Sequence, residues 1–156
     1  MQIALVRIDS RLVHGQVIEA WLPFTGASEI VVVDDRTASD FMMKEVMKMA
    51  VPPDVDLFCS SVKDFVSGCW ARGKESKRVL VLCRDLKVAL SIVKEVPGIL
   101  KINVGNLHYE TGKKRISSTV FFDADDERIV RKLKDLGVQI DVKAVPSDRE
   151  IDIELK

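Results

Sequence analysis

The chain has few of the residues that mark several common classes of protein. Its three cysteines are far apart and form no C-x-x-C pair, which argues against both a disulfide framework and a zinc site. We expect Cys59, Cys69 and Cys83 to be reduced thiols, mostly in the core. Basic and acidic residues cancel at 24 each, and aromatic residues make up only 6% of the chain. Without net positive charge or stacking platforms, binding to nucleic acid is disfavoured.

Long hydrophobic runs are also missing. No apolar stretch approaches the ~18 residues that a membrane-spanning helix needs. Met1 leads into a short apolar segment and not into the basic and apolar regions of a signal peptide. We therefore expect a protein that is made and kept in the cytoplasm. Its 156 residues, 47% of them hydrophobic, suit one globular domain spanning 1–156.

Short β-branched segments alternate with amphipathic segments of helix length, which is typical of βαβ units and a mainly parallel sheet. The predicted fold is an α/β domain with an open central sheet of about seven strands and helices on both faces. A turn signal at 109–113 predicts a late hairpin-like excursion. The expected strands are 2–7, 29–34, 55–59, 78–83, 100–104, 116–122 and 138–145. The expected helices are 15–22, 38–50, 61–72, 85–96 and 124–136.

Capping residues mark several expected helix ends. Thr37 with Asp40, and Ser61 with Asp64, have the spacing of an N-cap and the third helical residue. Gly137 is placed to follow the C-terminus of a helix. In the helix at 38–50, apolar residues form a broad stripe that we expect to pack on the sheet. The stripe comprises Phe41, Met42, Val46 and Met49.

The segment richest in chemically active groups is Arg7-Ile-Asp-Ser-Arg-Leu-Val-His-Gly-Gln16, directly after the apolar run 2–6. It places one of only two histidines among two arginines, a carboxylate and a glycine. At a strand's carboxyl end, beside the start of a helix, backbone N–H groups and guanidinium donors suit a phosphoryl group or another anion. A neutral imidazole can attack phosphorus without prior activation. The segment therefore predicts phosphoryl transfer through His14.

The side chains near His14 have expected roles and structural alternatives. Arg11 could hold two phosphate oxygens with its forked guanidinium, or it could be a surface residue paired with Asp9 or Asp35. Asp9 is better suited to orienting the imidazole or the arginines than to proton transfer, because a carboxylate aimed at phosphate would repel it. Arg7 is equally plausible as a phosphate contact and as an internal salt-bridge partner.

Backbone groups complete the predicted anion site. Gly15 lacks a Cβ, so the backbone can approach a phosphate closely. The N–H groups of Gly15 and Gln16 lie at the expected start of a helix, where the helix dipole favours an anion.

Further polar residues are expected at the same edge of the sheet, because ligands of open α/β sheets bind outside the carboxyl ends of the strands. The possible supporting residues there are Asp34, Asp35, Arg84 and Asn106. The two aspartates could act at the site or simply open the following helix. His108 is either a second site residue or a partly exposed loop residue. No motif calls for a metal ion.

The segment 7–17 resembles the signature R-I-D-x-R-L-[IV]-H-G-Q-V of the IIB domain in the mannose/sorbose family of the bacterial sugar phosphotransferase system. Further similarities follow over nearly the whole chain at Trp21, Val31-Val-Val-Asp-Asp35, Ala50-Val-Pro-Pro53, Asn103-Val-Gly105 and Val145-Pro-Ser-Asp148. Relatives read Asn-Val-Gly-Gly-Met where this chain has Asn103-Val-Gly-Asn-Leu107. Asn106 tolerates positive φ but adds a side chain near the expected site.

This resemblance implies a phosphotransferase that uses no cofactor and no metal. His14 would accept phosphate on Nδ1 from a phosphohistidine of a IIA domain. It would pass the phosphate to a hexose held by a IIC/IID permease pair, so that the protein would bind peripherally at the inner face of the membrane. Homo-oligomers are also implied. One alternative is a regulatory module in which phosphorylated His14 signals to a kinase or a transcription regulator without sugar transport. Another is a small-molecule binder without covalent chemistry.

Overall fold

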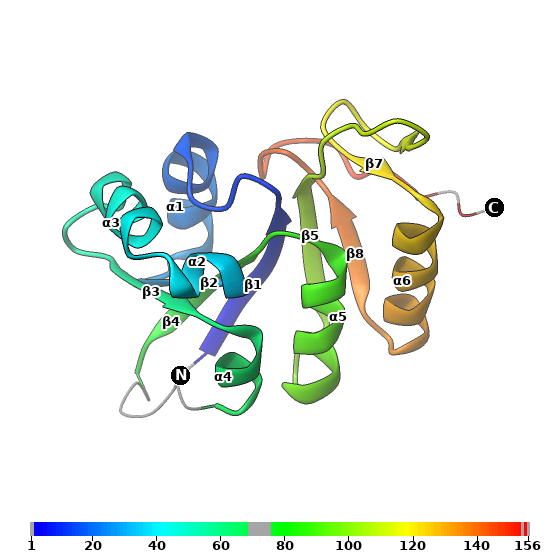
Figure 1. The fold of residues 1–156 in the computed structure, drawn as a ribbon. Coiled ribbons are helices and arrows are strands. Elements are labelled where there is room, and N and C mark those ends of the chain that lie inside the picture. Colours follow the sequence, from blue (N-terminus) through cyan, green and yellow to red (C-terminus); the bar gives the residue numbers. More distant parts are fainter. Residues whose placement is uncertain (1, 69–75, 154, 156) are drawn as a thin grey trace.

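Six parallel strands in the order β3-β2-β4-β1-β5-β8 form the central sheet of the computed structural model, which describes residues 2–68, 76–153 and 155 (Figure 1). The strands are β1 (Gln2–Asp9), β2 (Glu29–Val33), β3 (Asp56–Ser60), β4 (Arg78–Cys83), β5 (Lys101–Asn106) and β8 (Gln139–Val142). β1 lies between β4 and β5, with Val6 beside Val81 on one side and Ile102 on the other. The strand that leads into the histidine segment is therefore inside the sheet.

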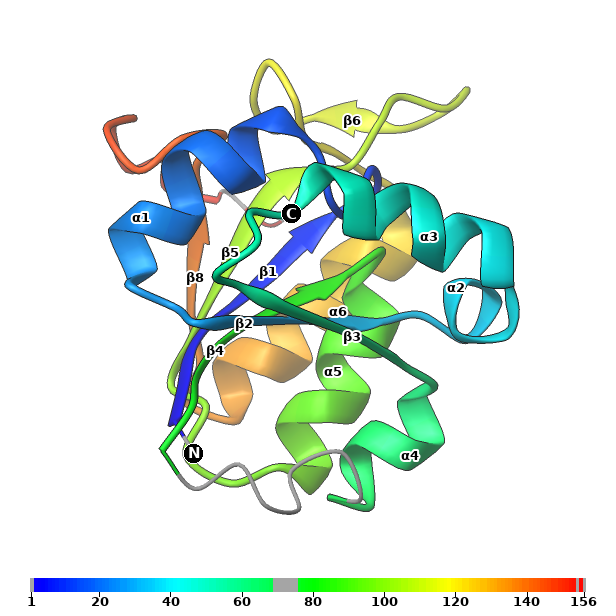
Figure 2. The same ribbon diagram turned by 90° about the vertical axis from the view of Figure 1, so that its left-hand side faces the viewer.

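Helices cover both faces of the sheet (Figure 2). On one face lie the π-helix η1 (Val17–Trp21), which continues into α1 (Leu22–Thr25), and α3 (Phe41–Ala50). On the other face lie α4 (Val62–Val66), α5 (Leu86–Glu95) and α6 (Ala124–Asp135). The buried apolar side chains correspondingly form two clusters, one including Trp21 and Met47, the other including Phe65 and Leu133. Within the described ranges no helix is both long and apolar enough to span a membrane.

The predicted α/β class, the mainly parallel sheet and the late hairpin-like excursion are confirmed. The central sheet has six strands and not seven, because the segment 116–122 contributes only β7 (Phe121–Phe122), which pairs antiparallel with β6 (Lys114–Arg115). Ser117 explains the difference. Its hydroxyl accepts hydrogen bonds from the amides of Thr119 and Val120, at 3.2 and 3.1 Å, so the chain turns where an extended strand was expected.

The helix expected at 38–50 consists of two helices, α2 (Asp35–Ser39) and α3. Asp34 caps α2 by accepting from the Thr37 amide at 3.0 Å, and Asp40 caps α3 by accepting from the Met43 amide at 3.0 Å. The pairing of Thr37 with Asp40 as one capping motif is therefore wrong. The two aspartates lie six positions apart. Each accepts a hydrogen bond from a backbone amide in the first turn of its helix, which would otherwise have no partner within the helix.

The other capping predictions are confirmed. Ser61 accepts from the Asp64 amide at the start of α4, at 3.1 Å, and Gly137 follows α6 with φ of 81°. The helix expected at 61–72 ends at Val66, and the part of it from residue 69 onward, with Cys69, lies outside the described residues. The thiols of Cys59 and Cys83 are free, the first half-buried and the second buried.

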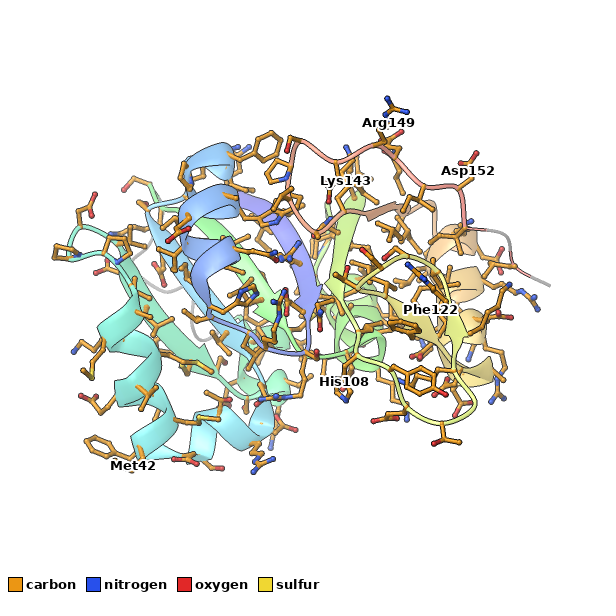
Figure 3. The ribbon with its side chains drawn as sticks, turned by 90° about the horizontal axis from the view of Figure 1, so that it is seen from above. Met42, His108, Phe122, Lys143, Arg149 and Asp152 are labelled. Atoms are coloured by element: carbon orange, nitrogen blue, oxygen red, sulfur yellow. The ribbon has the colours of Figure 1, made fainter. Side chains whose placement is uncertain are left out.

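The apolar stripe of α3 lies on the surface, so the prediction that it packs on the sheet is wrong. Phe41 and Met42 are each 69% exposed and Met49 is 87% exposed, whereas Met47 is buried. Figure 3 shows Met42 at the outer end of this helix. α3 carries apolar residues on two sides, and the side with Met47 packs in the cluster that contains Trp21.

Candidate functional site

The histidine segment 7–16 starts with the last three residues of β1 and continues into a loop at the carboxyl edge of the sheet. The Leu12 amide donates to the Asp9 carbonyl at 3.0 Å and closes a tight turn. Leu12 has φ of 58° and is the one non-glycine residue with positive φ among the described residues, yet its side chain is fully buried. This conformation costs a leucine roughly 1–2 kcal/mol, and such strain is concentrated at functional sites. The turn brings His14 back over Asp9.

Asp9 is the centre of the site. Its Oδ2 accepts hydrogen bonds from Arg7 Nη2 and from His14 Nε2, both at 2.9 Å. Its Oδ1 accepts from the backbone amide and the Nε of Arg11, at 3.0 and 3.1 Å. Burial raises the pKa of Asp9, but the hydrogen bonds from His14 and Arg11 outweigh it and lower the pKa to about 2. An ionised carboxylate with these partners supports the prediction that Asp9 orients the imidazole and the arginines.

The bond to Asp9 distinguishes the two nitrogens of the His14 ring. An ionised carboxylate can only accept, so Nε2 carries the proton and Nδ1 of the neutral ring presents a lone pair. The side chain of His14 is 17% exposed, which shields most of the ring but keeps it reachable from outside. The arrangement offers one defined nucleophilic nitrogen.

Arg7 is fully buried beneath this site. Its Nη1 donates to the Asn103 side-chain oxygen and, at 3.1 Å, to the Lys143 carbonyl. Its Nη2 donates to Asp9 and, at 3.2 Å, to the Ala144 carbonyl. Burial lowers the pKa of Arg7 from its ordinary value. Both Nη groups are bonded inside the protein, so Arg7 is placed as an internal salt-bridge partner and not as a phosphate contact.

Two residues that were not among the predicted site residues enclose Arg7. The guanidinium carbon lies 4.8 Å from the centre of the Trp21 ring, a cation–π contact. A Cβ built on Gly105 would approach the same carbon to 2.0 Å, so only glycine fits there. Trp21, Asn103 and Gly105 all belong to the segments that carry the family resemblance. The resemblance was thus the one signal in the sequence that could have identified them as site residues. Their contact with Arg7 is visible only in the folded chain.

Arg11 lies on the solvent side of Asp9, with its side chain 42% exposed. Besides the bonds to Asp9, its Nη2 donates to the Gln16 side-chain oxygen at 3.1 Å. Gly15 is exposed, and outside its chain neighbours and the backbone of its own helix no atom of the described structure lies within 4 Å of a Cβ built on it. The backbone is continuously helical over 15–25, so Gly15 and Gln16 open the helical segment as predicted. The Arg11 side chain is therefore partly open to solvent, and there is room beside Gly15.

Three of the predicted supporting residues hold the loop that follows β1 in place. They are Asp34, Arg84 and Asn106. Arg84 donates to both oxygens of Asp34, at 3.2 and 3.1 Å, and to the Ser10 carbonyl at 3.0 Å. Although burial raises the pKa of Asp34, the hydrogen bonds from Arg84 and Thr37 lower it. Ser10 bonds Asn106 twice, through the backbone at 3.0 Å and through the side chains at 2.7 Å. The side chain that Asn106 adds therefore fixes the loop.

Asp35 and His108 have no described contact with this group. Asp35 accepts from the Val62 amide at 2.8 Å and so joins α2 to the start of α4. His108 is 66% exposed, with Nε2 3.4 Å from Glu110 Oε1 on the loop that follows β5 (Figure 3). In the part of the chain that the structure describes, no group of three or more His, Cys, Asp or Glu residues could hold a metal ion.

Comparisons with known proteins point to the same chemistry. Residues 3–155 match the family described as the PTS system sorbose subfamily IIB component. The N-acetylgalactosamine-specific phosphotransferase enzyme IIB component 2 of Escherichia coli K12 is 33% identical over 151 residues, which cover 97% of this chain and 96% of that protein. The mannose-specific EIIAB component of the same strain is 30% identical over 97% of this chain but only 47% of its own length. The crystal structure of the N-acetylgalactosamine-specific IIB component 1 from E. coli superposes with a TM-score of 0.91 at 31% identity, covering 98% of this chain and all of that one.

Proposed function

This chain belongs to the sorbose subfamily of IIB components of the phosphotransferase system, and we propose that His14 is the residue on which it carries the phosphoryl group. IIB components of this family are sugar-specific phosphotransferases, and this chain is a phosphocarrier of that kind. The observation that carries the proposal is the 2.9 Å hydrogen bond between His14 Nε2 and Asp9. It leaves Nδ1 as the nucleophilic nitrogen.

The proposed step moves the phosphoryl group from one imidazole to another. The lone pair of His14 Nδ1 attacks phosphorus, and the new N–P bond forms as the donor's N–P bond breaks. The electron pair of the broken bond stays on the donor nitrogen. Because His14 Nε2 keeps its proton, the phosphorylated ring becomes cationic, and the adjacent Asp9 carboxylate stabilises that charge. No separate base is needed.

Arg11, Gly15 and Gln16 would hold the phosphoryl oxygens during this step. Phosphoryl transfer passes through a loose transition state that needs alignment and charge stabilisation on the equatorial oxygens. Arg11 is the exposed arginine beside Asp9, and it can exchange its bond to the Gln16 side chain for one to phosphate. Asp9 would keep its bonds to Arg7 and His14 through the exchange, so the ring would remain oriented.

The partners we propose are a IIA domain as phosphoryl donor and a IIC/IID permease with bound hexose as acceptor. The mannose-specific relative from E. coli is named EIIAB, and this chain corresponds to about half of its length, which supports a IIA component as the donor. A protein with this role would act on the cytoplasmic side, bound peripherally to the permease.

The proposal is tested by phosphorylating the protein with a phosphohistidine donor. One acid-labile, base-stable phosphate per chain is expected, and His14→Ala should abolish it. His108→Ala is the matched control and should keep it, because His108 lies on an exposed loop away from Asp9. Phosphate that persists on the His14→Ala protein would contradict the assignment.

A further inference from the structure

The turn 143–148, which follows β8, forms part of the floor of the site. The Lys143 carbonyl accepts from Arg7 Nη1 at 3.1 Å, and the Ala144 carbonyl accepts from Arg7 Nη2 at 3.2 Å. The Ala144 carbonyl also accepts from Trp21 Nε1 at 2.8 Å. Two consecutive carbonyls of this turn therefore hold the buried guanidinium.

Asp148 fixes the direction of both carbonyls. Its Oδ2 accepts from the amides of Ala144 and Val145, at 2.9 and 3.0 Å. Each peptide unit is planar, so the Ala144 N–H lies in one plane with the Lys143 carbonyl, and the Val145 N–H lies in one plane with the Ala144 carbonyl. When the carboxylate holds the two N–H groups on one side, the two carbonyls must point to the other side, where Arg7 lies.

Arg7 passes this constraint on to His14. One nitrogen, Nη2, bonds both the Ala144 carbonyl and Asp9 Oδ2, and the same Oδ2 accepts from His14 Nε2. The Nε of Arg7 has no hydrogen-bond partner in the described structure, so the position of its head group depends on the bonds of its two Nη groups and on Trp21 and Gly105. A shift of the Ala144 carbonyl therefore moves Arg7 Nη2 and changes its hydrogen bond to Asp9.

We propose that Asp148 is a positioning residue for His14. It fixes the peptide planes 143–144 and 144–145, these hold Arg7 against Asp9, and Asp9 keeps His14 in the Nε2–H tautomer with the ring in place. Asp148 is itself exposed and touches none of the reacting groups. The kinetic consequence rests on the proposed phosphoryl transfer at His14, whereas the effect on the tautomer does not.

The first test is the tautomer of His14 in the unphosphorylated protein, read from long-range ¹H–¹⁵N correlation spectra. We expect the natural protein to show the Nε2–H form and Asp148→Ala to show a mixture of the two tautomers. Asp148→Asn should keep the natural form, because its amide oxygen can accept the same two hydrogen bonds. Asp152→Ala is the matched control on the same exposed C-terminal segment, where Arg149 and Asp152 project outward (Figure 3). An unchanged tautomer in Asp148→Ala, or equal mixing in Asp148→Asn, overturns the proposal.

The second test is the rate of phosphoryl acceptance from a phosphorylated IIA donor. Asp148→Ala should lower kcat about tenfold, the low end of the range known for residues that orient a metal-bound histidine, and leave KM for the donor unchanged. Asp148→Asn should restore the rate. A rise in KM alone would instead assign Asp148 to donor binding and overturn the proposal. If the natural protein is never phosphorylated at His14, the proposed function fails, while the tautomer comparison still decides the role of Asp148.

Trp21→Phe, alone and combined with Asp148→Ala, gives a further test through the same peptide unit. It removes the indole N–H from the Ala144 carbonyl but keeps an aromatic ring over Arg7. Because both substitutions act on the same peptide unit, their combined effect on kcat should be smaller than the product of the single effects. Fully independent effects would contradict a path through Ala144.

Discussion

Gly105 lies against the guanidinium of Arg7 so closely that a Cβ at this position would come within 2.0 Å of the guanidinium carbon. Gly105→Ala must therefore displace Arg7 from Asp9 and from its carbonyl partners. We expect the free energy of unfolding to fall by about 2–5 kcal/mol, the range for overpacking combined with disruption of a buried ion pair. Chemical denaturation measures this fall.

Gly15→Ala is the control for that measurement, because the space around Gly15 is open. Its free energy of unfolding should stay within about 0.5 kcal/mol of the natural value. If Gly105→Ala proves equally mild, Arg7 does not occupy the position described.

The low pKa of Asp9 predicts a specific dependence of stability on pH. The folded-state pKa of about 2 lies below the ordinary value of 3.8, so the folded protein binds the Asp9 proton less tightly than the unfolded chain. This stabilisation is present in full above the ordinary pKa and is lost as pH falls from about 4 to about 2. It amounts to about 2 kcal/mol, an order-of-magnitude figure.

Unfolding measured from pH 6 down to pH 2 tests this dependence. The difference in stability between the natural protein and Asp9→Asn should shrink by about 2 kcal/mol over that window. A difference that stays constant with pH would mean that the Asp9 carboxylate is not held as an ion by Arg7, Arg11 and His14.

Arg11→Lys tests the proposed phosphate contact, because an ammonium cannot reproduce the forked guanidinium. We expect phosphoryl acceptance to slow by about 10- to 1000-fold, which corresponds to ~1.4–4 kcal/mol of lost charge stabilisation. Stopped-flow or quench-flow transfer from a phosphorylated donor measures the rate. An unchanged rate would leave Arg11 as no more than the surface partner of Asp9.

The orientation of α3 predicts contrasting effects of two methionine substitutions. Met47 is 7% exposed and Met49 is 87% exposed. Met47→Ala should cost about 2–5 kcal/mol of stability, and Met49→Ala should change it by less than about 0.5 kcal/mol. Denaturant unfolding of the two variants decides this, and a larger loss for Met49→Ala would mean that the apolar stripe does pack in the core.

The same helix shows what the sequence could and could not predict of the fold. The alternation of strands and helices and several caps are local signals, and they were sufficient for the α/β class and the parallel sheet. The apolar periodicity of α3 was compatible with two buried sides. Which side faces the sheet is decided by contacts between Met47 and residues distant in the chain, and no local pattern contains that information.

The candidate site divides in the same way. Asp9 ends β1, and Arg11 and His14 lie on the loop that follows it, so the rule for strand ends and the local motif were enough to bring them together. The direction of Arg7 could not be predicted, because its partners Asn103 and Lys143 are 96 and 136 positions away. Strand periodicity predicts which face of the sheet Arg7 lies on. It does not predict that Gly105, Trp21 and two backbone carbonyls surround the side chain there.

The position of phosphorus on the imidazole ring tests the central claim most directly. In protein labelled with ¹⁵N-histidine and phosphorylated by its donor, ³¹P–¹⁵N coupling identifies the bonded nitrogen. The 2.9 Å bond from Nε2 to Asp9 predicts phosphorus on Nδ1 of His14, with the proton retained on Nε2. Phosphorus on Nε2 of His14, or on His108, would contradict the account.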